Sequence, residues 1–381
     1  MGFFAALFWM FSLVRRLFGK KKPFKLLNLP YLAFAKVLNG MKVNEAVNLS
    51  QTSIKCEIKM KRVKKRIYKI IIENLDDCEE IDEENTEIKH LQRIILVNKK
   101  CDVIDAYNYM KNCKKYTRRV FAGYSVNFWI SKFCQIYKGK SSFTEISYLN
   151  LEDLIHLLQH FHELFAFDHV NLVMDHGRLF GDYQEVVKHI LFRKCHYVEI
   201  CGRKSRLTTE NMQYLMNNID LKYGLLIRCW HPSGFDKELL SGIPRLDIFY
   251  AQNYELEDVK NIFRFCEVIH LHIHAFTAKC IKQFILHWLA GHVPNLRRFR
   301  FVCFCYPEVV DYILNEIQHF KWDANRRAEI FIDGLEKINC GAGYDIERDD
   351  GLLATLICIG KEVEFLVWHD RFPNDLTQRS H

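Results

Sequence analysis

Three histidines at alternating positions are the first candidates for metal chemistry in this chain of 381 residues. In a β-strand, His270, His272 and His274 would share one face, and the two apolar residues between them would share the other. Two imidazoles spaced in this way can bind zinc, but no acidic or cysteine partner stands at ligand spacing. We therefore interpret the three histidines as part of the polar face of a strand, and we predict no metal and no cofactor.

Sequence patterns for catalysis are incomplete. Gly139-Lys140-Ser141 could end a phosphate-binding loop, but Cys134 stands where the first glycine of such a loop is required. Neither a His-Glu-x-x-His nor a Gly-x-Ser-x-Gly motif occurs. The 14 cysteines form no Cys-x-x-Cys pair, which favours buried, reduced thiols. We therefore predict a protein that is not an enzyme.

The charge distribution argues against a nucleic-acid partner. The net charge of +8 is uneven along the chain, because residues 23–66 are basic and residues 76–87 are acidic. Opposed blocks of this kind are typical of solvated helix ends and loops, whereas nucleic-acid binding favours one continuous basic surface. We expect a protein partner and a cytoplasmic or nuclear location.

The N-terminus carries an apolar run, residues 3–14, followed by a basic cluster. The run is shorter than the roughly 20 residues that a membrane-spanning helix needs. A signal peptide would carry its basic residues before the apolar run. A gene-model extension, a helix on a membrane surface and a signal-like anchor remain as alternatives, and membrane contact through residues 3–18 stays open. We expect residues 1–22 to be dispensable for folding.

Residues 23–53 predict two short helices with more apolar surface than they can bury alone. Leu26, Leu27 and Leu29 precede Pro30, and proline is favoured at the start of a helix. Apolar residues then recur at helical spacing. Such a surface either docks on a partner or packs against the rest of the chain. A basic third helix is expected over residues 55–66.

Two segments of the chain resemble one protein family. Leu26-Leu27-Asn28-Leu29-Pro30 and Leu49-Ser50-Gln51-Thr52-Ser53 resemble the F-box of nematode F-box proteins. The C-terminal series resembles the F-box-associated region of the same proteins, and its residues are Ile346, Arg348, Asp350-Gly351, Ala354-Thr355 and Val367-Trp368. The resemblance implies an adaptor that docks on the Skp subunit of a cullin-based ubiquitin ligase core and binds a target protein. The residues implied in Skp docking are Leu26, Leu27, Leu29, Pro30, Leu32, Val37, Leu38, Met41, Val47 and Leu49. The alternative is a protein-binding scaffold without a ligase role, for which membrane association through the N-terminus is one option.

From residue 150 onwards, short apolar strands alternate with amphipathic helices. The expected strands are residues 170–174, 197–201, 225–229, 246–250, 268–274 and 298–304. Their spacing of roughly 22 to 28 residues is that of a leucine-rich-repeat-like solenoid, although an ordinary α/β sheet would give the same alternation. Residues 344–348, 352–359 and 362–368 predict an antiparallel meander, because Asp350-Gly351 is typical of a hairpin turn.

The polar residues of the expected strands are the candidates for target binding. They should share one solvent-facing surface, since solenoids bind partners on such surfaces. These candidates are Glu199, Arg228, Asp247, His270, His272, His274, Arg298 and Arg300, with Trp230 at the edge of the surface.

The predicted fold class is α+β or α/β, with an N-terminal helical box followed by a degenerate repeat domain that a β-meander closes. The expected divisions are an N-terminal extension (1–22), the F-box (23–66), a linker region with an acidic loop (67–149), the F-box-associated repeat domain (150–372) and a polar tail (373–381).

Overall fold

The computed structural model describes the chain as two compact units. The described residues are 26–75, 91–97, 117–121, 124–133, 143–148, 150–272, 277–302, 307–334, 336–360 and 362–373. One unit comprises residues 1–65 with 163–165, and the other comprises residues 66–162 with 166–381. Several expectations fall outside the described residues, namely those for residues 1–22, the acidic stretch 76–87, the segment 139–141, His274 and residues 374–381 of the tail.

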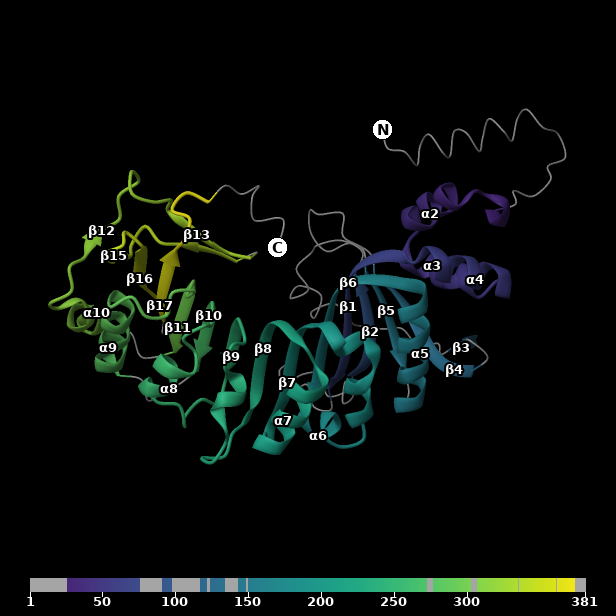
Figure 1. Cartoon of the computed structure of the whole chain (residues 1–381), viewed down its shortest axis with the longest axis horizontal. Coiled ribbons are helices and arrows are strands. Elements are labelled where there is room, and N and C mark those ends of the chain that lie inside the picture. The colour runs from purple at the N-terminus through teal and green to yellow at the C-terminus, as the bar shows by residue number, and fades with distance from the viewer. Residues whose placement is uncertain are drawn as a thin grey trace, which may run out of the picture. The chain divides into compact units, whose positions relative to one another are not determined.

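The first unit consists of short helices (Figure 1). They are η1 (Leu26–Asn28), α2 (Tyr31–Gly40), α3 (Val43–Ser50) and α4 (Ile54–Val63). Pro30 precedes α2 with φ of −54°, the value that its ring imposes. The side chain of Ser53 caps α4 by accepting the N–H of Cys56 at 3.2 Å. The expected N-terminal helices are therefore confirmed, and their shared core is formed by Phe34, Leu38, Val43, Ala46, Val47 and Met60.

The second unit is built on one large sheet, which contains fifteen of the described strands. The first five are β1 (Lys65–Leu75), β2 (Leu91–Val97), β3 (Thr117–Phe121), β4 (Tyr124–Phe133) and β5 (Phe143–Tyr148). They pair antiparallel in the order β1-β2-β5-β4-β3. The region expected to be a linker, residues 67–149, therefore contributes strands to the sheet. The apolar runs in β1 and β2 explain this, because Ile70, Ile72, Ile94 and Leu96 are all fully buried.

Six parallel strands continue the sheet in chain order after α5 (Leu151–Leu164). They are β6 (Phe165–Asp175), β7 (Cys195–Arg206), β8 (Leu221–Trp230), β9 (Arg245–Ile248), β10 (Val268–Leu271) and β11 (Arg298–Val302). The segments that connect them are α6 (His176–Leu179), η3 (Gln184–Lys188), η4 (Ile190–Lys194), α7 (Thr209–Asn218), η5 (Lys237–Leu240), α8 (Leu256–Asn261) and α9 (Ala278–Leu289).

This part of the structure is the mixed α/β region that the sequence predicted. Between β6 and β7, η3 and η4 form two 3-10 turns rather than a single α-helix. His189 separates the two turns, since its backbone is extended, with ψ of 140°.

Alternate residues of the parallel strands face opposite sides of the sheet. Leu246 and Ile248 of β9 are fully buried, as are Phe299 and Phe301 of β11. The ring of Phe284 in α9 packs against both phenylalanines, with centroid distances of 4.6 and 6.0 Å. One face of the sheet is therefore covered by helices, and the other carries the polar residues.

The C-terminal meander belongs to the same sheet. Its strands are β15 (Tyr344–Glu347), β16 (Leu353–Ile359) and β17 (Glu362–Trp368), and β17 pairs antiparallel with β11. The expected meander is therefore confirmed. Between β11 and the meander lie α10 (Pro307–Leu314), β12 (Phe320–Lys321) and a separate hairpin of β13 (Ile330–Asp333) and β14 (Glu336–Asn339).

The hairpin β13–β14 packs against the polar face of the sheet at this end. Its Phe331 and Ile338 belong to one apolar cluster with Leu366 and Trp368 of β17. The rings of Phe331 and Trp368 meet edge to face at 5.1 Å. Both faces of the sheet are thus covered at its C-terminal end, where β17 contributes residues to each side.

The residues of the C-terminal sequence pattern form a buried hydrogen-bonded chain. The indole N–H of Trp368 donates to the Thr355 hydroxyl at 2.8 Å, and that hydroxyl donates to Asp345 at 2.8 Å. Arg327 completes the chain by donating to Asp345 at 2.8 Å. Because buried polar groups need partners, this chain explains why a threonine and a tryptophan occupy these two positions.

Among the described helices, none combines the length and the apolar character required to cross a membrane. Of the described cysteines, Cys195, Cys229, Cys266 and Cys340 are buried free thiols, in line with the sequence analysis. Burial raises the pKa of Cys195 to about 12, which keeps its thiol protonated. Cys358 in β16 departs from the expected reduced state, because it is disulfide-bonded.

Candidate functional site

The helical unit divides the predicted Skp-docking residues into buried and exposed groups. Leu38 (1% exposed) and Val47 lie in the core of the unit, so their side chains are not available to a partner. Leu32 is 80% exposed and Pro30 is also exposed. The remaining members are half-buried, and these are Leu26, Leu27, Leu29, Val37, Met41 and Leu49.

Three exposed apolar residues of this unit were missed by the sequence analysis. Tyr31 lies beside Leu32 at the start of α2, while Ile54 (74% exposed) and Ile58 lie one turn apart on α4. The signal was present in the sequence, because Ile54 and Ile58 stand four residues apart in an otherwise basic helix. Their exposure indicates a surface on α4 that a partner could cover.

Two lysines of the basic third helix and its end have structural roles. Lys59 Nζ donates hydrogen bonds to the carbonyl oxygens of Leu27 and Leu29, both at 2.7 Å. Lys65 Nζ donates to the carbonyl oxygens of Leu38 and Asn39, at 3.2 and 2.9 Å. The bonds of Lys65 satisfy carbonyl groups at the end of α2, which carry partial negative charge, and those of Lys59 satisfy carbonyl groups in and just after η1. Burial lowers the pKa of Lys65 to about 8.

In the second unit, the described members of the predicted target-binding set lie on one face of the sheet. Glu199 and Arg228, on neighbouring strands β7 and β8, form an ion pair at 2.9 Å. Asp247 of β9 contacts both His270 and His272 of β10, at 3.3 and 3.4 Å. Burial alone would raise the pKa of Asp247, but its hydrogen bonds to the two histidines hold this pKa well below its usual range.

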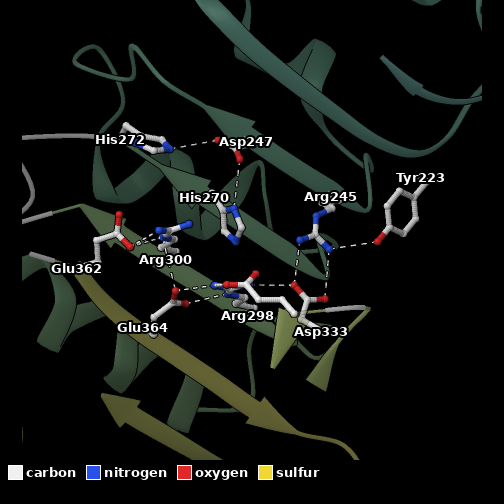
Figure 2. A network of polar contacts seen from close by, with 11 residues as sticks. Tyr223, Arg245, Asp247, His270, His272, Arg298, Arg300, Asp333, Glu362 and Glu364 are labelled. Atoms are coloured by element: carbon white, nitrogen blue, oxygen red, sulfur yellow. Dashed lines mark hydrogen bonds and ion pairs between the residues drawn. The ribbon is translucent and has the colours of Figure 1, made fainter. Parts of the chain in front are cut away.

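Arg298 is the centre of a buried ionic network (Figure 2). Its guanidinium binds Glu364 of β17 at 2.6 Å, Glu336 of β14 at 2.5 Å and Asp333 of β13 at 3.2 Å. Asp333 also receives two hydrogen bonds from Arg245 of β9, at 3.2 and 2.9 Å. Arg298 therefore joins the hairpin β13–β14 to the sheet and to the meander.

The carboxylates of this network remain charged because of the arginines. Burial alone would raise the pKa of Asp333, but Arg245 and Arg298 hold it below its usual value. The hydrogen bond from Arg298 likewise lowers the pKa of Glu336. Arg300 is paired in the same way, since it binds Glu362 with its Nε at 2.6 Å.

The expectation of a solvent-facing polar surface is therefore wrong at this end of the sheet. Arg298 is 1% exposed and His270 is also buried. The physical reason is the hairpin β13–β14, whose carboxylates cover Arg298 and neutralise it. The alternation of polar and apolar residues in β11 was predicted correctly, but the element that covers the polar side was not.

The exposed part of the polar face lies at the carboxyl ends of β8, β9 and β10. Trp230, 42% exposed, stacks on Tyr250 with ring centroids 4.7 Å apart. Arg228 lies over the ring of Phe249 at 4.5 Å, and Phe249 stacks on His272 at 4.0 Å. Of the aromatic members, only Trp230 was indicated by the sequence analysis.

Within the described ranges, no group of three or more His, Cys, Asp or Glu side chains is arranged to hold a metal ion. The two described histidines of the alternating run share a carboxylate, Asp247, instead. Beyond its internal ion pairs, this face carries cationic and aromatic side chains. Such side chains are suited to binding a partner.

Part of the sequence that forms this surface matches a known protein family. Residues 235–301 match the family described as F-box associated, and the match includes β9, β10 and most of β11. No solved structure matches the chain significantly.

Three uncharacterized proteins of Caenorhabditis elegans are similar to the chain. One is 23% identical over 191 residues, which cover 48% of this chain and 43% of the relative. A second is 29% identical over 147 residues, covering 34% and 33%. A third is 24% identical over 359 residues, covering 93% and 96%. The alignments thus span less than half the length of the first two relatives and nearly all of the third.

Proposed function

We propose that the chain is a substrate-recognition subunit of a cullin-based ubiquitin ligase, in which the helical unit docks on the Skp adaptor and the sheet unit binds the target. The observation that carries this proposal is the match of residues 235–301 to the F-box-associated family. A chain with such a region and a separate N-terminal helical unit has the two parts that this role requires.

Docking on Skp would use the exposed apolar side chains of the helical unit. Leu32, Ile54 and Ile58 are exposed although they are large and apolar. Burying each of them in an interface would contribute roughly 1.5–3 kcal/mol. The proposed interface therefore comprises these three residues with Tyr31, and only Leu32 among them was predicted from the sequence. Leu38 and Val47 are buried and would hold the helices together.

Target recognition would use the second unit, and no residue of the chain would take part in the chemistry. The mechanism is tethering, since holding a target close to activated ubiquitin makes the transfer effectively intramolecular. The parallel order of β6 to β11, with a helical segment between successive strands, supports a leucine-rich-repeat-like solenoid as the scaffold. The protein would act in the cytoplasm or the nucleus.

Affinity purification of the full-length chain, followed by mass spectrometry, tests this proposal. The variant Leu32→Ser/Ile54→Ser/Ile58→Ser should lose Skp and the cullin core while the wild-type chain retains both. Tyr312→Ser is the matched control, because Tyr312 is an exposed aromatic residue of α10 in the other unit. If neither Skp nor a cullin is recovered with the folded wild-type chain, the chain is a protein-binding scaffold without a ligase role.

A further inference from the structure

The carboxyl ends of β7, β8 and β9 carry a group of exposed basic and aromatic residues that the ionic network does not use. We propose that this group is a docking surface for an acidic peptide segment with a central aromatic or leucine side chain. The inference rests on the proposed function in one respect, because it identifies the peptide as part of the target protein.

A bulge in β7 displays the basic residues. β7 and β8 pair in regular register from Tyr197 opposite Gly224 to Gly202 opposite Cys229, and the next pair is Arg206 opposite Trp230. Residues 203–205 of β7 therefore have no pairing partner in β8, because Cys229 and Trp230, the partners of Gly202 and Arg206, are consecutive. The sequence of this segment is Gly-Arg-Lys-Ser-Arg, so three of the four residues after the glycine are basic.

Gly202 is required for the bulge. Its φ of +133° is a conformation that other residues rarely adopt, and a Cβ there would lie 3.1 Å from the Ser205 hydroxyl. Lys204 and Arg206 are both exposed. In the part of the chain that the structure describes, no carboxylate forms an ion pair with either of them. The bulge thus presents two cations without an internal counter-ion.

An aromatic pair lies directly beside the basic bulge. Trp230 is the pairing partner of Arg206, and its exposed ring stacks on Tyr250 with an interplanar angle of 18°. Arg228 and Phe249 extend the group along the same edge of the sheet. Tryptophan, tyrosine and arginine are the residues that most often dominate the binding energy of protein interfaces.

Charge complementarity selects an acidic partner. Two nearby carboxylates already have partners within the sheet, since Glu199 forms an ion pair with Arg228 and Asp247 contacts the two histidines. Lys204 and Arg206 are therefore available to the carboxylates of an acidic partner. The free ring face of Trp230 can receive one flat or branched apolar side chain of the same segment.

A nucleic acid fits these observations less well than a peptide. Trp230 and Tyr250 stack on each other, so they leave one free ring face at this point rather than a series of platforms for successive bases.

Fluorescence anisotropy with the full-length chain tests the proposal. The probe is a labelled pool of seven-residue peptides, with Phe, Tyr or Leu at the centre and mixtures of Asp and Glu on both sides. A pool with serine at the centre, a pool with lysine in place of the acids, and labelled oligouridylate serve as comparisons. We expect the acidic apolar pool to bind more tightly than all three.

Two variants of the docking surface and two matched controls localise the binding. Trp230→Ala and Lys204→Glu/Arg206→Glu should each weaken binding of the acidic pool by at least about tenfold. Arg193→Glu/Lys194→Glu reverses two exposed charges at the other end of β7, and Tyr312→Ala removes an exposed aromatic ring from α10. Both controls should stay within about twofold of the wild-type chain.

Three results would overturn the proposal. The first is that the serine-centred pool or the lysine pool binds as tightly as the acidic apolar pool. The second is that Arg193→Glu/Lys194→Glu weakens binding as much as Lys204→Glu/Arg206→Glu. The third is that oligouridylate binds more tightly than the acidic apolar pool and that this binding depends on Trp230. Skp binding is measured on the same preparations. If Skp binds and the peptides do not, only this inference fails; if the peptides bind and Skp does not, the proposed ligase role fails and the docking surface stands.

Discussion

At the scale of single residues, exposure separates side chains that hold a unit together from those that a partner can reach. Leu32 and Leu38 lie in the same helix, α2, and have the same side chain, yet the first is exposed and the second is buried. Helical spacing places both on an apolar stripe and cannot decide which of them faces a partner. The structure decides it, because Leu38 is 1% exposed whereas Leu32 is 80% exposed.

The two leucines should therefore respond differently to the same substitution. Leu38→Ala should lower the free energy of unfolding of the helical unit by about 2–5 kcal/mol, because it removes buried methyl groups and leaves a cavity. Leu32→Ala should change it by less than about 0.5 kcal/mol and should weaken Skp binding instead. Hydrogen exchange of residues 31–63 measures the first effect. Equal destabilisation by both substitutions would contradict the assignment.

A buried histidine should make the sheet unit sensitive to acid. His231 is packed between the rings of Phe235 and Tyr254, with centroid distances of 4.8 and 5.8 Å. Its burial lowers its pKa to about 4, against about 6.5 in an unfolded chain. The unfolded state therefore binds more protons between these values, so stability falls as the pH is lowered from about 6.5 to 4, by up to about 3 kcal/mol in total.

The variant His231→Phe removes this titration and keeps a ring of similar shape. Between pH 7.5 and 5, it should lose about 2 kcal/mol less stability than the wild-type chain, as measured by urea unfolding at each pH. His292→Phe, at an exposed position, is the control and should follow the wild-type chain. Identical pH dependence of all three proteins would show that His231 is not buried in the folded state.

At the scale of elements, the hairpin β13–β14 determines which part of the polar face is accessible. It is held by the ion pairs of Asp333 and Glu336 with the arginines, and by the contact of Phe331 with Trp368. Removing one carboxylate leaves a buried guanidinium partly uncompensated. The ionic contribution of this hairpin can therefore be measured separately from its apolar contribution.

Asp333→Asn should lower stability by about 1–3 kcal/mol, less than for an isolated buried pair because Arg298 keeps Glu336 and Glu364 as partners. Amide hydrogens of residues 330–339 should exchange faster, while those of β8 should not. Asp220→Asn breaks an exposed pair with Lys222 and should have an effect below about 1 kcal/mol. Unchanged exchange in Asp333→Asn would mean that the apolar contacts alone hold the hairpin.

The sequence predicted the helices and strands better than it predicted which of their faces are covered by other parts of the chain. Period-two alternation in β11 placed Phe299 and Phe301 on the buried face correctly, because that pattern is local. The partners of Arg298 could not be identified in this way, since Asp333 and Glu364 lie 35 and 66 positions away. Trp230 and Tyr250 likewise meet only because β8 and β9 are neighbours in the sheet.

At the scale of the whole molecule, the proposed function assigns different tasks to the two units. In this proposal, the helical unit would offer exposed apolar residues to Skp, and the sheet unit would offer a basic and aromatic edge to a target. Substitutions in one unit should therefore leave the binding of the other partner unchanged. The resemblance of two distant sequence segments to one family was the feature that predicted this division, while the residues that perform each task required the structure.

The most direct test of the central claim is the affinity of the purified full-length chain for purified Skp, measured by isothermal titration calorimetry. The account predicts saturable binding by the wild-type chain. It also predicts a loss of at least about a hundredfold in Leu32→Ser/Ile54→Ser/Ile58→Ser, since one buried anchor commonly contributes about 2 kcal/mol. The variant should keep the circular dichroism spectrum of the wild-type chain. Absence of binding by the folded wild-type chain, or equal binding by the variant, would contradict the account.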